Sequence, residues 1–302
     1  MTNSRAMPKK TNAYLLLHLT VFLFGFTGVL GKLISVGSSD IVWYRMGIAA
    51  IALGLYLVSF PKPKIPSESF PKVLATGAVI AIHWIFFFEA VKQSSVSVAL
   101  VGVTSSTLFT ALLSPLFTKR KILAYEVLLG IMVLVGIGVI FQISTSFRVG
   151  IILSVIAAAL ASVFTLINEQ FIRSLAPSRV SFWEMAAGWA AVTLYFIFSG
   201  KFDAQFFSIS TEDLLWLLVL GVACTAFAFV ASIRVMEHLP AFTVSISINL
   251  EPIYAILLAF VIFEEYELWN FSFVIGATII IASILLNSII KKRLKQKAKL
   301  NT

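Results

Sequence analysis

The sequence has little charge for its length. Only 12% of its 302 residues are charged, whereas 59% are apolar, and about a quarter of the residues in an ordinary soluble domain are charged. A soluble fold needs a polar surface that covers its apolar interior. A chain of this composition cannot supply one, so we expect lipid to be its solvent over most of its length.

The chain also has few residues that could carry redox or metal chemistry. Cys224 is its single cysteine, which excludes an intrachain disulfide framework and a site made of several cysteines. Its three histidines, His18, His83 and His238, lack the close spacing of metal ligands. No phosphate-binding loop, nucleophile elbow or dinucleotide fingerprint is present. We therefore expect neither a cofactor nor an enzymatic activity.

The formal net charge of +9 is high, and nucleic-acid binding is one explanation of such a charge. The basic residues, however, lie in short loops and in one terminal tail rather than in a continuous patch. This distribution is typical of membrane topology signals, so no nucleic-acid partner is expected.

Ten stretches are long and apolar enough to cross a bilayer, which takes about 20 residues. They run over residues 13–35, 40–60, 70–91, 95–117, 122–143, 149–173, 180–199, 213–235, 241–263 and 268–290. Proline-containing segments separate several of them, as at 61–66 and 176–178. The first stretch is too long for a cleavable signal peptide and is expected to be an anchor. The fold class is therefore all-α integral membrane, with ten transmembrane helices.

The distribution of charge orients these spans. With both termini on one side, 18 of the 23 Lys and Arg residues lie on that side, three lie on the other, and two fall inside spans. The positive-inside rule then predicts that the N and C termini are cytoplasmic. Residues 1–12 and the basic segment 291–302 are the predicted cytoplasmic tails, and the latter is read as a flank of the last helix rather than a lipid-binding site.

The two halves of the chain resemble each other. Placing Ser106 on Pro252 without gaps also places Phe117 on Phe263 and Gly130 on Gly276. A similar alignment puts Arg45 on Glu184, with opposite charge. An odd number of spans per half inserts the second half upside down, so we predict two inverted five-helix repeats, residues 13–143 and 149–290. Inverted repeats are common in secondary transporters, whose substrate site lies between the repeats.

Three motifs make the chain similar to one known family. These are Asn249-Leu250-Glu251-Pro252 with the apolar run to Ala259 and Phe263-Glu264, the glycine pair Gly130 and Gly136, and residues 24–32. Over residues 14–290 the sequence resembles the EamA branch of the drug/metabolite transporter superfamily. That resemblance implies a ten-helix bundle with a central cavity, alternating access, and export or exchange of small metabolites.

Charged and aromatic residues at mid-depth are the candidate binding residues, because charge is costly inside a bilayer. Glu251 lies before Pro252, which is expected to kink its helix and free backbone carbonyls. Glu251 and His83 are the candidates for proton coupling or substrate contact, and a structural interhelical hydrogen bond is the alternative for each. Trp84 follows His83 and is either a cavity residue or a packing residue.

Further candidates flank these positions. The hydroxyl cluster Thr104, Ser105, Ser106 and Thr107 corresponds to Glu251 in the other repeat and either lines the cavity or bonds its own backbone. Tyr254 shares a helix face with Glu251, and Asn249 lies about half a turn away. Arg45 and Glu184 are interpreted as charges that extend toward the membrane faces or pair with loop groups, rather than as functional residues.

The sequence as a whole predicts a secondary transporter in the cytoplasmic (inner) membrane that moves a small organic solute outward or by exchange. An amino acid, a nucleobase, a hydrophobic cation and a drug-like molecule all fit, and both proton coupling and uncoupled facilitation remain open. The alternatives are a membrane-embedded enzyme acting on lipid and a non-transporting sensor or scaffold. The short loops leave no room for a soluble catalytic or signalling domain.

Overall fold

The computed structural model describes residues 10–117, 122–141, 147–171, 174–228, 230–231, 235, 250–264 and 271–300. The described part is helical and contains no strand. Its helices are α1 (Lys10–Leu33), α2 (Ser38–Ser59), α3 (Phe70–Gln93), α4 (Val96–Val103), α5 (Ser106–Phe117), α6 (Ala124–Phe141), α7 (Arg148–Phe171), α8 (Pro177–Ser199), α9 (Thr211–Leu218), the π-helix η2 (Val219–Phe227), α12 (Glu251–Phe263) and α13 (Phe271–Leu300).

Five helices are long and apolar enough to cross a membrane. They span Ala13–Leu33, Ser38–Ser59, Phe70–Gln93, Arg148–Asn168 and Pro177–Ser199, and the bent pair α4 and α5 makes a sixth candidate. Each lies within a few residues of a predicted span. The helices α6, α9, η2, α12 and α13 occupy the remaining predicted stretches but do not meet this test in the described residues. The all-helical membrane fold is thus confirmed.

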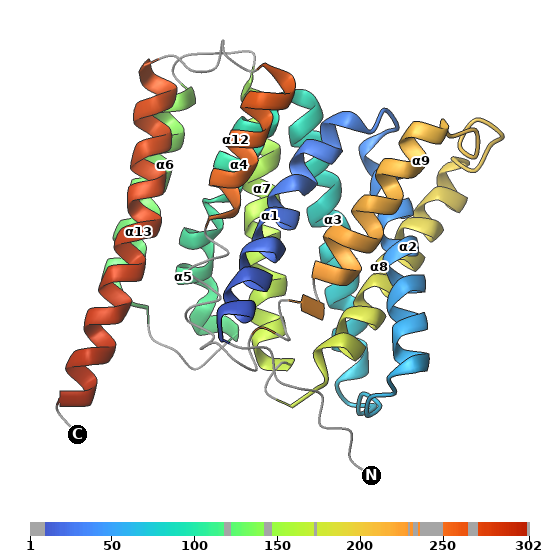
Figure 1. Cartoon of the computed structure of the whole chain (residues 1–302), viewed down its shortest axis with the longest axis horizontal. Helices are drawn as coiled ribbons and strands as arrows, with labels where there is room; N and C mark the ends of the chain where they lie inside the picture. The colour runs from blue at the N-terminus through green and yellow to red at the C-terminus, as the bar shows by residue number, and fades with distance from the viewer. Residues whose placement is uncertain are drawn as a thin grey trace.

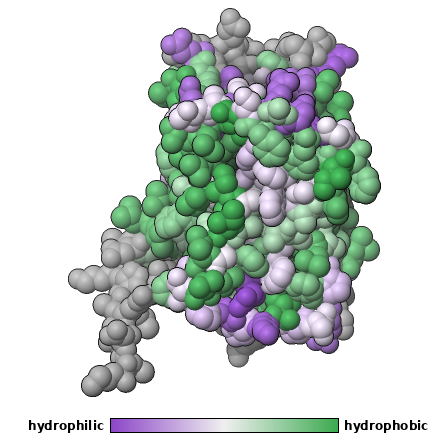
Figure 2. All heavy atoms as spheres, turned by 90° about the vertical axis from the view of Figure 1, so that its right-hand side faces the viewer, coloured by the Kyte–Doolittle hydropathy of each residue, from purple (hydrophilic) through white to green (hydrophobic). Residues whose placement is uncertain are grey.

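The helices run roughly along one direction and give the molecule two polar ends. Figure 1 shows α1 beginning and α13 ending at the same end of the bundle, which we call the terminal end. The other end, where α1 meets α2 and α8 leads to α9, is called the distal end. Figure 2 shows a broad apolar surface between polar side chains at the two ends. Large apolar side chains such as Leu55, Val58 and Phe198 are well exposed, as expected for contact with lipid.

Small residues set how closely the helices pack. A β-carbon on Gly77 of α3 would collide with the backbone carbonyl of Glu184 in α8, so these two helices touch through their backbones. Gly136 of α6 lies in the same way against the carbonyl oxygen of Gly276 in α13. Figure 1 shows α6 and α13 side by side at one edge of the bundle. Glycine at helix contacts is a general feature of membrane bundles.

Some of the described helices correspond in length or in end point between the two halves of the chain. The opening helices of the two halves, α1 and α7, both contain 24 residues, and α2 and α8 contain 22 and 23. α5 and α12 end at Phe117 and Phe263, which are the positions that the repeat aligns. These described helices therefore correspond in length or in end point between the two halves.

The predicted proline kink is placed differently in the structure. α12 begins at Glu251, so Pro252 lies in its first turn, where a missing backbone N–H leaves no hydrogen bond unmade. The predicted span began ten residues earlier, and its first part lies outside the described residues. Glu251 therefore marks the start of a described helix rather than the middle of one.

Candidate functional site

Arg45 of α2 is the most deeply buried basic side chain that the structure describes in full. It is 3% exposed, and its guanidinium carbon lies 3.8 Å from the ring centroid of Trp84 in α3. Its Nε donates a hydrogen bond of 2.7 Å to the Thr225 hydroxyl of η2. The interpretation of Arg45 as a charge that reaches the membrane surface is therefore wrong. The cation is held instead by an aromatic face and a hydroxyl, both inside the bundle.

The π-helix η2 is what presents Thr225 to Arg45. The Thr225 hydroxyl accepts from Arg45 and donates to the carbonyl oxygen of Leu220, five residues earlier, over 2.7 Å. Gly221 allows this helix to approach α2, since a β-carbon there would lie 2.6 Å from a side-chain carbon of Ile48. π-helical turns occur often at functional sites, and nothing in the apolar sequence of this segment signalled one.

Glu251 lies opposite this cation on α12. It is partly buried and interacts electrostatically with Arg45, although the two do not form a direct ion pair. Gly25 of α1 positions the start of α12, because a β-carbon on Gly25 would stand 3.0 Å from the Glu251 carbonyl oxygen. Of the predicted site residues, Trp84 contacts Arg45, and Glu251 interacts with the same cation at longer range.

His83 points away from this group toward α7. Its Nδ1 donates to the carbonyl oxygen of Ala157 over 2.8 Å, and its ring packs edge-on against Phe164 with centroids 5.3 Å apart. The side chain is 7% exposed. Its observed contact is thus an interhelical hydrogen bond, and its electrostatic interaction with Arg45 is its link to the site.

Tyr254 and the hydroxyl cluster make local contacts. The Tyr254 hydroxyl lies 3.1 Å from His18 Nδ1, which ties α12 to α1. Thr104 and Ser105 sit at the bend of about 40° between α4 and α5, and their hydroxyls donate to the carbonyl oxygens of Val101 and Gly102. The Ser106 carbonyl accepts from Ser162 of α7. Asn249 lies outside the described residues, as does the side chain of Thr107.

Glu184 is a second buried charge that was expected near the surface. It is 1% exposed, and its Oε1 has no hydrogen-bond partner among the described residues. Its interaction partner is Asn168 of α7. The expectation that Glu184 extends to the membrane face is wrong, because close packing at Gly77 encloses it between α3, α7 and α8.

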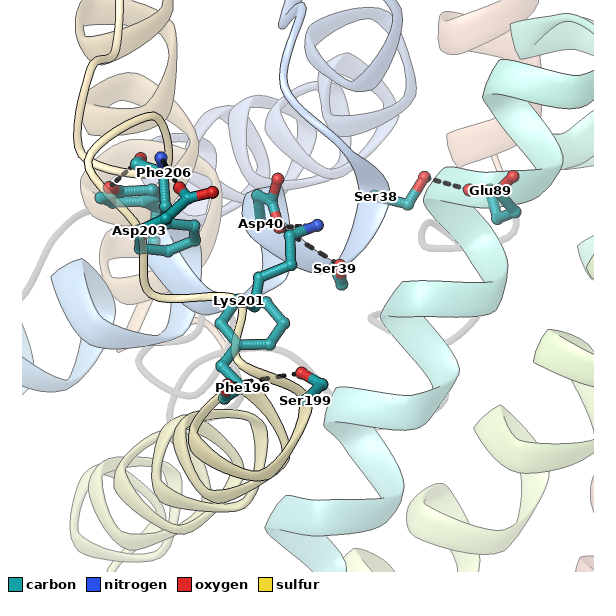
Figure 3. Close-up of polar contacts among 10 residues, drawn as sticks. Ser38, Ser39, Asp40, Glu89, Phe196, Ser199, Lys201, Asp203 and Phe206 are labelled. Atoms are coloured by element: carbon teal, nitrogen blue, oxygen red, sulfur yellow. Dashed lines mark hydrogen bonds and ion pairs between the residues drawn. The ribbon is translucent and has the colours of Figure 1, made fainter.

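A cleft of about 710 Å³ opens between α2, α3 and α8 toward the distal end. Its walls are apolar, with Ala81 and Val192, and its rim carries Ser38, Glu89 and Lys201. Figure 3 shows the rim contacts: Ser38 donates to Glu89 over 2.6 Å, and Lys201 pairs with Asp40 at 2.9 Å. Arg45 does not line this cleft, which is therefore separate from the Arg45 group.

Helices of membrane-spanning length, an apolar outer surface and buried charges define a multi-pass α-helical membrane protein. Comparison with known protein families identifies the family to which this membrane protein belongs. The EamA-like transporter family matches residues 11–142 and, a second time, residues 148–289. The chain therefore belongs to the EamA-like transporter family, and its role is transport.

Two relatives agree with this assignment, and one solved structure has a similar fold. The chain is 24% identical to the uncharacterized transporter YxxF of Bacillus subtilis over 83% of this chain and 81% of that protein. It is 22% identical to an uncharacterized transporter of Archaeoglobus fulgidus, over 93% and 98% of the two chains. One crystal structure superposes with a TM-score of 0.65 at 16% identity, covering 95% of this chain and 99% of the other, which supports the fold.

Proposed function

We propose that the protein is a secondary transporter of a small organic solute in the cytoplasmic (inner) membrane. Ten spans form two inverted five-helix repeats, residues 13–143 and 149–290, with both termini in the cytoplasm. The solute binds near the midplane between the repeats and moves outward or by exchange as the halves alternate their access. The excess of basic residues in the tails and loops that the sequence assigns to the side of the termini supports this orientation.

The observation that carries the proposal is the Arg45 group. Arg45 and Trp84 belong to the first half of the chain, whereas Thr225 and Glu251 belong to the second. Buried charge in a membrane protein is costly and marks substrate or ion pathways. A group of charged and polar residues shared by both halves can bind a solute, and its contacts change when one half moves against the other.

Interrupted helices support a solute-binding site at the same place, near the midplane between the halves. α4 and α5 meet at a bend, and α12 begins at Glu251, the residue next to the position that the repeat aligns with Ser106. Helix ends expose backbone groups without intrahelical partners, and transporters use such ends to bind solutes and ions near the midplane.

The predicted residues take different roles in this proposal. Trp84 supports solute binding by covering the guanidinium of Arg45, and Glu251, which acts on Arg45 from α12, is the first candidate for proton coupling. His83 is the second, through the Nε2 that its bond to Ala157 leaves available. Thr104, Ser105 and Ser106 act through the bend between α4 and α5, and Tyr254 acts through its contact with α1. Asn249 is retained as a candidate on its sequence position alone.

Counterflow into proteoliposomes tests the proposal. Vesicles are preloaded with unlabelled amino acids, organic acids, nucleosides and organic cations, and uptake of each labelled compound is measured for the wild type and Glu251→Gln. We expect selective uptake of one class, with proton-driven uptake lost and counterflow retained in Glu251→Gln. Failure of every compound to move, with the protein folded and monodisperse, would contradict the proposal.

A further inference from the structure

The guanidinium of Arg45 is buried with part of its hydrogen-bonding capacity unused. Its Nε donates to Thr225, but its Nη1 has no hydrogen-bond partner among the described residues. A guanidinium has five N–H donors arranged for planar acceptors, and a buried donor left unpaired costs free energy. Arg45 is therefore a desolvated cation with at least one N–H donor that no described residue satisfies.

Among the residues that the structure describes, no carboxylate neutralises Arg45 directly. Within the described part of the chain, Arg45 forms no ion pair. The negative group that acts on it is Glu251 of α12, which interacts at longer range. The other titratable groups facing it are His83 of α3 and Cys224 of η2. An anion at Nη1 would satisfy both the free donor and the unpaired charge.

Trp84 limits the shape of such an anion. The indole covers one face of the guanidinium at 3.8 Å, so a ligand approaches along the guanidinium edge, in its plane. Carboxylates are planar and accept parallel hydrogen bonds from a guanidinium edge. The indole itself is 7% exposed, so its contribution is to hold the cation in this plane.

We propose that Arg45 binds a carboxylate group of the transported solute, and that this carboxylate replaces Glu251 as the counter-charge of Arg45. The inference rests on the proposed transport function and adds a substrate class, small organic carboxylates, to it. In the empty protein Glu251 supplies the negative charge from α12. Once the solute is bound, its carboxylate supplies that charge at closer range. Because Arg45 and Glu251 belong to different halves of the chain, the exchange of partners links solute binding to the relative position of the halves.

Charge selectivity of the wild-type protein is the first test. Counterflow is measured with pairs that differ only in the acid group: benzoate and benzamide, lactate and lactamide, phenylalanine and phenylalaninamide. Uridine and choline serve as neutral and cationic probes. We expect every transported compound to carry a carboxylate, with its amide moving at least about 100-fold more slowly, as for loss of one partner of a buried charge pair.

Variants of Arg45 assign the selectivity to this side chain. Arg45→Gln is expected to lose uptake of the carboxylate, whereas Arg45→Lys keeps the charge and retains part of it. Arg179→Gln is the matched control, because Arg179 lies at the terminal end and donates to the carbonyl oxygen of Lys62. The control is expected to transport at the wild-type rate. Because the wild-type comparison of acid with amide needs no variant, misfolding of Arg45→Gln does not remove the test.

The outcomes separate this inference from the proposed function. Transport of uridine, choline or an amide, at a rate unchanged in Arg45→Gln, would overturn carboxylate recognition and leave the transport function standing. If none of the probes moves, the transport function fails and the inference fails with it. Acid-selective uptake that depends on Arg45 and not on Arg179 supports both.

Discussion

Gly25 of α1 lies directly against Glu251 at the start of α12. A β-carbon on Gly25 would stand 3.0 Å from the Glu251 carbonyl oxygen and 3.2 Å from the backbone nitrogen of Ala255. Real β-carbons rarely come so close to backbone atoms, and backbone cannot move aside as a flexible side chain can. The position of Glu251 relative to Arg45 thus depends on the absence of a side chain at residue 25.

The first prediction follows from this contact. Gly25→Val is expected to push the start of α12 away from α1 and to abolish transport, with unfolding free energy lower by about 1–3 kcal/mol from overpacking. Counterflow and thermal unfolding measure the two effects. Gly138→Ala is the control, because a β-carbon at Gly138 meets no atom within 4 Å. Wild-type transport by Gly25→Val would show that this contact does not position Glu251.

Trp84 is expected to contribute to affinity through Arg45. Trp84→Leu removes the aromatic face 3.8 Å from the guanidinium, and a buried cation–π contact is worth about 2 kcal/mol. We expect the affinity for the transported solute to fall about 10- to 30-fold, and Trp84→Phe to lose less. Trp183→Leu is the matched control, since Trp183 packs against Phe70 and Phe182 instead. Equal losses in the two leucine variants would argue for a general packing effect.

The bond between Tyr254 and His18 is expected to keep the terminal end closed. Tyr254→Phe removes this contact between α12 and α1, which is 3.1 Å long and worth about 1 kcal/mol. The population open at the terminal end should rise about fivefold. Cys224 is the single cysteine and is fully buried, so its labelling by a membrane-impermeant maleimide added on that side reports the opening. Tyr56→Phe is the control, and an unchanged labelling rate in Tyr254→Phe would rule out this role.

The distal end has a corresponding contact between Asp213 and Ser35. The Asp213 carboxylate accepts from the Ser35 backbone nitrogen over 2.7 Å and from its hydroxyl over 2.5 Å, joining α9 to the end of α1. Asp213→Asn weakens bonds to a charged acceptor, each worth about 1.5–3 kcal/mol. Labelling of Cys224 from the distal side should become faster, while labelling from the terminal side should not. Ser39→Ala, which removes a part-buried contact with the neighbouring Asp40 and none with α1 or α9, should change neither rate.

Much of the helix pattern could be predicted from the sequence, because apolar run length and proline position determine it locally. The predicted span 40–60 became α2 (Ser38–Ser59), and 180–199 became α8 (Pro177–Ser199). The break at Thr104 and Ser105 was missed, since the run 95–117 carries no charge and the bend depends on hydroxyls that bond their own backbone.

The composition of the site was less predictable. Depth along a span can be counted from sequence, and this count placed Arg45 near a membrane face. The burial of Arg45 depends on which helices surround it: η2 brings Thr225 to one side and α3 brings Trp84 to another. The pairing of Tyr254 with His18 likewise joins residues far apart in the chain. Such contacts are set by tertiary packing, which cannot be read from one sequence alone.

The last prediction concerns pH and follows from competition for Arg45. A bound carboxylate and an ionised Glu251 repel each other beside one cation, so solute binding favours the protonated form of Glu251. His83 and Cys224, the other titratable groups facing Arg45, do not add negative charge while His83 is neutral or cationic and Cys224 is a thiol. Carboxylate uptake by the wild type is therefore expected to rise as the pH falls on the side from which the labelled carboxylate is taken up.

In Glu251→Gln, whose amide does not titrate, uptake should lose this pH dependence, while the preference for the acid over its amide should remain. A pH profile of uptake in vesicles without a membrane potential measures both, with Glu212→Gln, an exposed change on α9, as the control. A wild-type profile kept by Glu251→Gln would assign the proton to another group.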